Sequence, residues 1–149
     1  MRIETTRLVI DTEEGVSIAD LTGDVDAFIR STGVRDGLCV MMVGRHDCFL
    51  SLAPELEDAM DDLMRLVREA DALHAAALLR EPATDADRAD VDTSGPAPPG
   101  FLAESLSFAV RDGEPELGSW ESILLVDGAG PARRAVEVTV MGATTSART

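Results

Sequence analysis

The chain is poor in aromatic residues and in histidine. Only 3% of its 149 residues are aromatic, with no Tyr and one Trp, and it has only two His. The core must therefore be mostly aliphatic, and a chemistry that needs several imidazoles as metal ligands or proton shuttles lacks its groups. Hydrophobic residues still make up 45% of the chain, which excludes disorder throughout its length.

Basic residues are also scarce. Thirteen Lys and Arg stand against 28 Asp and Glu, which gives a formal net charge of −15. This acidic balance repels phosphate backbones and anionic lipid surfaces, so neither nucleic acid nor a membrane is an expected partner. No apolar run approaches the roughly 20 residues of a membrane span, and the first residues carry no apolar signal region.

Cysteine is equally rare, with only Cys39 and Cys48 in the chain. We expect both to be reduced thiols of a cytoplasmic protein, and one disulfide between them is the alternative. The bias toward Ala, Arg, Asp and Gly is typical of a GC-rich bacterial genome.

The first part of the chain predicts two strands and a short helix. Residues 2–10 and 16–21 are rich in β-branched and apolar residues, and the turn between them predicts a hairpin. Thr22 is a good helix cap, and a helix is expected over 23–31, ending at Gly33.

The nearly uninterrupted apolar run 37–43 predicts a strand buried on both sides. A polar loop follows, and 49–52 predict a short strand. Pro54 suits the first turn of a helix, and apolar residues then recur at helical spacing to at least Ala72.

The second part predicts a β-rich end to a single domain over 1–143. Residues 81–99 are rich in Asp, Ala, Ser, Gly and Pro and predict a long exposed loop, and 144–149 predict a tail. The turn Asp112–Gly113 indicates a hairpin. Further strands are expected over 106–110, 120–126 and 135–141.

Five short motifs, in this order and spacing, resemble the YjbQ family, also called the secondary thiamine-phosphate synthase family. They are Ile18–Thr22, Ser31–Gly37, Glu116–Trp120, Leu124–Gly128 and Arg133–Val136. The resemblance covers roughly 3–67 and 100–142. It implies an α+β fold with a largely antiparallel sheet or sandwich, one long and one short helix, and a homotrimer.

The resemblance also implies a weak thiamine-phosphate synthase activity at a His-rich site. Here the sequence departs from the family. Residues 45–48, Arg-His-Asp-Cys, stand where the family has His-Thr-Ser-Ala, and Ala53-Pro54-Glu55 stand in the place of Asn-Glu. The segment near 96–99 contains no His, although the family has one there. The same groups therefore cannot run the family's chemistry.

The candidate site residues come from these positions. The catalytic candidates are Arg45, His46, Cys48 and Glu55, and the ligand-binding candidates are Asp47, Ser119, Trp120, Arg133 and Arg134. Arginines clamp phosphates and carboxylates, and a thiol can be a nucleophile. The plainer interpretation is a polar loop, a packed thiol, a core Trp and two solvated basic residues.

No metal or cofactor is expected, because His46 and Cys48 with Asp47 and the distant His74 do not make a tetrahedral zinc set. We expect a degenerate site with weak or no catalysis that can bind a small anionic molecule. One alternative is an active transferase that works by positioning and cationic stabilisation. The other is a structural or regulatory partner of related chains.

Overall fold

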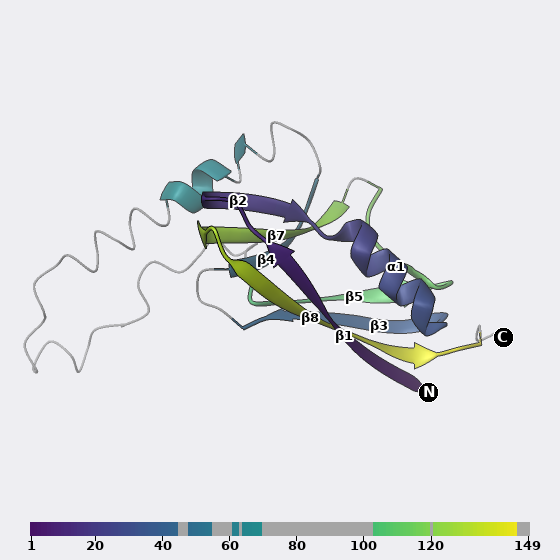
Figure 1. The fold of residues 1–149 in the computed structure, drawn as a ribbon. Coiled ribbons are helices and arrows are strands. Elements are labelled where there is room, and N and C mark those ends of the chain that lie inside the picture. The colour runs from purple at the N-terminus through teal and green to yellow at the C-terminus, as the bar shows by residue number, and fades with distance from the viewer. Residues whose placement is uncertain (45–47, 55–60, 63, 70–102, 120, 146–149) are drawn as a thin grey trace, which may run out of the picture.

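Two antiparallel sheets lie against each other in the computed structural model, which describes residues 1–44, 48–54, 61–62, 64–69, 103–119 and 121–145 (Figure 1). The strands are β1 (Arg2–Asp11), β2 (Gly15–Asp20), β3 (Asp36–Val43), β4 (Cys48–Pro54), β5 (Ser105–Arg111), β6 (Glu114–Pro115), β7 (Glu121–Gly130) and β8 (Arg133–Ala143). The larger sheet has the order β1-β8-β3-β5-β6, and the smaller has the order β2-β7-β4.

The main core lies between the two sheets and is aliphatic, as the composition requires. Alternate residues of β3 and β8, such as Met41 and Val138, point inward and are fully buried. They meet Leu50 of β4 and Ile123 of β7 from the smaller sheet. Burying one such side chain stabilises the fold by about 1.5–3 kcal/mol, so this interface dominates the energetics.

Strand β7 is the strand that is buried on both sides. Every residue from Ser122 to Asp127 is buried. Leu124 and Val126 pack on the far side of the small sheet against Val67, which belongs to a helical stretch over 61–62 and 64–69. The expected long helix is thus present in part.

The prediction that the apolar run 37–43 is buried on both sides is wrong for the single chain. Strand β3 forms, but it alternates: Cys39 and Met41 point into the core, whereas Leu38 and Met42 are 40% and 55% exposed. A continuous apolar run indicates a strand that is buried on both faces, but the single chain covers only one face of β3.

Two further expectations need correction. Strands β1 and β2 do not form a hairpin, because β1 pairs with β8 in the large sheet and β2 pairs with β7 in the small one. The tight connection between them moves the chain from one layer to the other. Pro54 does not begin the helix either, since it is the last residue of β4.

The helix α1 (Thr22–Thr32) closes one end of the sandwich and buries Val25 and Ile29. Thr22 is not its cap, because the N-cap is Leu21 and the Thr22 hydroxyl accepts a hydrogen bond from the Ile123 N–H at 2.8 Å. Gly33 ends the helix as expected, with a φ of 71° that favours glycine.

The expected hairpin at Asp112–Gly113 is confirmed. Both residues have positive φ, as a two-residue turn of this kind requires, and the turn joins β5 to β6. The α+β class and the largely antiparallel sheets are also confirmed.

The predicted loop 81–99 and most of the predicted tail 144–149 lie outside the described residues, and the domain bounds stay a prediction. Within the described part of the chain, no helix is both long and apolar enough to cross a membrane.

Candidate functional site

A buried ion pair ties β8 to the end of β7. Arg134 Nε donates to Asp127 Oδ2 at 2.8 Å, and Arg134 Nη2 donates to Asp127 Oδ1 at 3.0 Å. The two side chains are only 4% and 0% exposed. The pairing is bidentate, which is the geometry that a guanidinium and a carboxylate favour most.

Two more hydrogen bonds complete the environment of this carboxylate. The Thr12 hydroxyl donates to Oδ2 at 2.6 Å, and the Ala129 N–H donates to Oδ1 at 2.9 Å. Burial raises the pKa of Asp127, but the hydrogen bonds from Arg134, Thr12 and Ala129 outweigh it and lower the pKa from 3.8 to about 2. The Arg134 guanidinium is therefore committed to joining β8 to β7 through Asp127.

Arg133, the preceding residue, is in the opposite situation. Its Nε donates to Asp11 Oδ1 at 2.9 Å, and both side chains are about three-quarters exposed, at 74% and 73%. The hydrogen bond to Arg133 lowers the pKa of Asp11 from its ordinary value. A solvated pair of this kind exchanges partners readily, so Arg133 can turn to a ligand.

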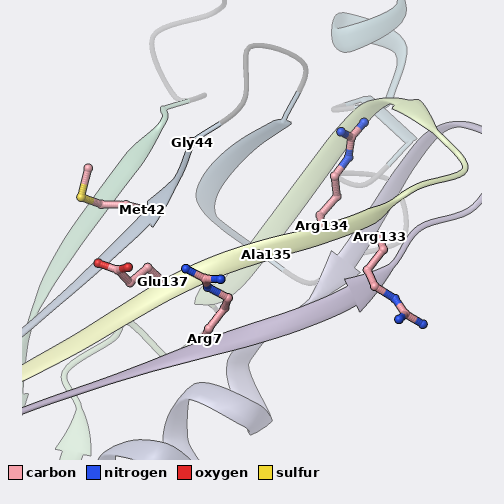
Figure 2. Close-up of a pocket in the computed structure, with 7 residues that line it drawn as sticks. All are labelled: Arg7, Met42, Gly44, Arg133, Arg134, Ala135 and Glu137. Carbon is pink, nitrogen blue, oxygen red and sulfur yellow. The ribbon is translucent and has the colours of Figure 1, made fainter.

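An open hollow of about 490 Å³ lies on the outer face of the large sheet, over the first part of β8. Its walls are formed by Arg7, Met42, Gly44, Arg133, Arg134, Ala135 and Glu137 (Figure 2). Gly44 and Ala135 have the smallest side chains of this set, which makes room between the longer ones. Figure 2 shows Arg134 pointing to the other side of β8 from Arg133.

Arg7 is the cation of the hollow that forms no ion pair with a described carboxylate. It lies directly opposite Glu137 in the β1–β8 ladder, yet the two form no ion pair, and no other described residue pairs with Arg7. Arg7 and Arg133 lie four ladder positions apart, about 13 Å along the strands. Ala135 lies between them, so a ligand above Ala135 is within reach of both long side chains.

The sequence did not single out Arg7, since no motif contains it. The two-residue alternation of a strand could have pointed to Arg7. Side chains at alternate positions of β1 share a face, and Arg7 lies on the exposed face with Val9 and Asp11. Sequence alone does not say which distant strand pairs with β1, and that pairing places Arg7 beside Glu137 and near Arg133.

Several predicted site residues lie outside the described part of the chain: Arg45, His46, Asp47, Glu55 and Trp120. Their roles stay predictions. Gly44, which directly precedes the first three, lines the hollow with Arg133.

Cys48 and Ser119 occupy opposite ends of the β4–β7 ladder. Cys48 pairs with Asp127, whereas Pro54 pairs with Glu121, just after Ser119. The two ends of the ladder are six residue steps apart, about 20 Å. Cys48 is fully buried, which favours a packing role for its thiol, while Ser119 is exposed.

The thiol of Cys39 does not have the features of a reactive cysteine. Burial raises the pKa of Cys39 to about 12, so this thiol stays protonated and unreactive at neutral pH. Cys39 and Cys48 form no disulfide. Among the described residues, no group of three or more His, Cys, Asp or Glu side chains could hold a metal ion.

The chain is similar over most of its length to proteins of one family. The family model for UPF0047 proteins of the YjbQ-like type matches residues 6–143. A UPF0047 protein of Mycobacterium tuberculosis is 33% identical over 130 residues, which cover 84% of this chain and 87% of that protein. Another, from Methanothermobacter thermautotrophicus, is 24% identical over 142 residues, covering 95% and 94%.

Solved structures show the same fold. A hypothetical protein from Aeropyrum pernix has a TM-score of 0.74 at 24% identity, covering 94% of this chain and 99% of that one. A YbjQ-like protein of unknown function from Sulfolobus solfataricus has a TM-score of 0.73 at 20% identity, covering 95% and 99%.

Proposed function

The chain belongs to the YjbQ-like UPF0047 family, and from that premise we propose that it binds a small oxyanion in the hollow beside Arg7, with weak or no catalysis. The observation that carries the proposal is the Arg7 guanidinium, which lines the hollow and forms no ion pair with any described residue. In a chain with a net charge of −15, such a cation is unusual.

The chemistry of the hollow favours an oxyanion ligand. A guanidinium offers several N–H donors in a planar fork that matches phosphate and carboxylate oxygens. Arg133 supplies a second guanidinium, held only by a solvated pair with Asp11. Glu137, the neighbour of Arg7 in the β1–β8 ladder, carries a negative charge that opposes anion binding, and this makes its removal informative.

The test is calorimetric titration with inorganic pyrophosphate. We expect Arg7→Gln to weaken binding by about tenfold, because a charge-assisted contact is lost. Glu137→Gln should strengthen binding by about fivefold, because a like charge a few ångströms from the anion is removed. Both substitutions neutralise a charge, but one should weaken pyrophosphate binding and the other should strengthen it. General damage to the fold would weaken binding in both variants.

The matched control is Arg2→Gln, which removes the same charge from the same strand. Arg2 is paired with Glu4 and does not line the hollow. If Arg2→Gln and Arg7→Gln weaken pyrophosphate binding equally, only net charge matters and the site proposal fails. Absence of binding to the wild-type protein overturns the proposal directly.

The alternative function is an active thiamine-phosphate synthase-like transferase with a rebuilt site. It is decided by a sensitive thiamine-phosphate formation assay beside a family member that keeps its histidines, with Arg45→Ala as the control. Robust turnover that Arg45→Ala abolishes would make this chain an enzyme. The third proposal is a structural or regulatory partner of related chains, favoured if no phosphate ligand shifts the thermal melt. The family resemblance also leads us to propose a homotrimer.

A further inference from the structure

We propose that the ligand of the hollow is a small zwitterion, with an ammonium group a few bonds away from its oxyanion, and that Glu137 binds the ammonium. This inference rests on the proposed function, because Arg7 must hold the oxyanion. It adds the class of the ligand and the residue that selects it. Amino acids and amino-alkyl phosphates have this chemistry.

Two opposite charges face each other across the β1–β8 ladder without pairing. Arg7 and Glu137 occupy directly opposite positions, and both line the hollow. Opposite charges at such positions attract each other, yet neither side chain forms an ion pair with a described residue. Figure 2 shows the Glu137 carboxylate directed toward Met42 and not toward Arg7. The hollow therefore presents a cation and an anion side by side, and each is available to a ligand.

The other oppositely charged pair of this ladder shows that the strands do not force such charges apart. Asp11 and Arg133 also lie directly opposite each other on the outer face of the large sheet. They form an ion pair, with Arg133 Nε 2.9 Å from Asp11 Oδ1. The same ladder geometry thus permits a closed pair, but Arg7 and Glu137 stay apart. A ligand that carries both charges can bind them without first breaking an ion pair.

The strand spacing sets the separation of the two charged groups in the ligand. An oxyanion above Ala135 is within reach of Arg7 and Arg133. Glu137 lies two residues from Ala135 on the same face of β8, about 7 Å along the strand. The Glu137 side chain covers part of this distance, so an ammonium a few bonds from the oxyanion reaches the carboxylate. A bare oxyanion leaves the carboxylate without a partner.

Met42 forms an apolar wall beside this carboxylate. It lies directly opposite Glu137 in the β3–β8 ladder and is 55% exposed. A methionine side chain is flexible and adapts to irregular apolar shapes, so it can pack on the carbon spacer of the ligand. The volume of the hollow, about 490 Å³, lies in the range of small-molecule sites. The site therefore fits two opposite charges joined by a short apolar spacer.

Glu137 makes the hollow selective against simple anions. Its carboxylate repels phosphate or pyrophosphate, but it attracts the ammonium of a zwitterion. Specificity commonly depends on an element that repels the wrong ligand. A zwitterion also carries less net negative charge than the corresponding oxyanion, so a chain with a net charge of −15 repels it less.

The test compares phosphoethanolamine with ethyl phosphate by calorimetric titration. Ethyl phosphate lacks the ammonium and is otherwise the same molecule. We expect the wild type to bind phosphoethanolamine about tenfold more tightly, because the ammonium gains a charge-assisted contact with Glu137. Glu137→Gln should remove this preference, although the same variant should bind pyrophosphate more tightly. β-Alanine and propionate repeat the comparison with a carboxylate, and the pair that shows the preference identifies the oxyanion.

The matched control is Glu4→Gln, which removes the same charge from β1 three positions from Arg7. Glu4 pairs with Arg2 and does not line the hollow. We expect Glu4→Gln to keep the preference of the wild type. Circular dichroism melts verify that both variants are folded.

The outcomes separate this inference from the proposed function. If the wild type prefers neither zwitterion over its matched anion while Arg7→Gln weakens the binding of both, the zwitterion is excluded and the oxyanion site stands. A preference that Glu137→Gln keeps, or that Glu4→Gln loses equally, also overturns the inference, because Glu137 is then not the partner of the ammonium. If neither these ligands nor pyrophosphate bind, the proposed function fails and this inference fails with it.

Discussion

Arg133 and Arg134 are neighbours in sequence and opposites in the fold. Arg134 faces inward from β8 and makes a bidentate pair with Asp127, with side chains 4% and 0% exposed. Arg133 faces outward and pairs with Asp11, with side chains 74% and 73% exposed. Two adjacent arginines in a sequence therefore need not share one role. Successive side chains of a strand point to opposite faces, so Arg134 is part of the buried framework and Arg133 is accessible to solvent and ligands.

The largest effect on stability is expected for the buried pair. Asp127→Asn should lower the free energy of unfolding by about 3–5 kcal/mol, because it leaves the buried Arg134 guanidinium without its counter-charge. Urea unfolding monitored by circular dichroism measures the loss. Arg134→Lys should destabilise less than Asp127→Asn, because the charge remains and only the bidentate fork is lost.

A shift of the urea midpoint that is no larger for Asp127→Asn than for the exposed Asp11→Asn would contradict the distinction between the buried and the exposed pair. It would mean that water reaches the Arg134–Asp127 pair and that burial does not set the role of these arginines. If Asp127→Asn fails to fold at all, Arg134→Lys still provides a measurable value.

Local signals predicted the elements well and their partners poorly. The strand at 2–10, the helix ended by Gly33 and the turn at Asp112–Gly113 all follow from residues close together in sequence. The hairpin assigned to β1 and β2 failed because pairing depends on the whole sandwich. A short turn is compatible both with a hairpin and with a crossing between layers.

The candidate site was predictable only in part for the same reason. Arg133 was found through its motif, and the structure places it at the hollow. Arg7 was missed, because its importance comes from a ladder that joins residues more than 120 positions apart. The predicted roles of Arg45 and His46 lie outside the described residues and stay predictions.

The Thr12 hydroxyl links the stability of the buried pair to pH. Thr12→Val removes the hydroxyl that donates to Asp127 at 2.6 Å and should cost about 1–3 kcal/mol at neutral pH, with Thr12→Ser as the control that keeps it. The pKa of Asp127 is about 2 in the fold against 3.8 ordinarily. Its contribution to stability is thus complete above pH 3.8 and is lost as the pH falls through about 2.

Removing the hydroxyl removes one cause of the lowered pKa, so the pKa of Asp127 rises in the Thr12→Val fold. The pH-dependent loss of stability should then span a narrower window, in a protein that is already less stable at pH 7. Urea midpoints at several pH values between 2 and 7 measure this window. An identical pH dependence in Thr12→Val and Thr12→Ser would show that the hydroxyl does not act on the carboxylate.

The smallest stability effect belongs to the exposed pair. Asp11→Asn should leave the urea midpoint unchanged, because the pair that it breaks is solvated and screened by salt. Its effect should appear in binding instead. Asp11 competes with any anion for the Arg133 guanidinium, so its neutralisation should tighten pyrophosphate binding by about two- to fivefold. A destabilised Asp11→Asn with unchanged pyrophosphate affinity would reverse the roles: Arg133 would then belong to the framework, and Arg7 would have to hold the ligand without it.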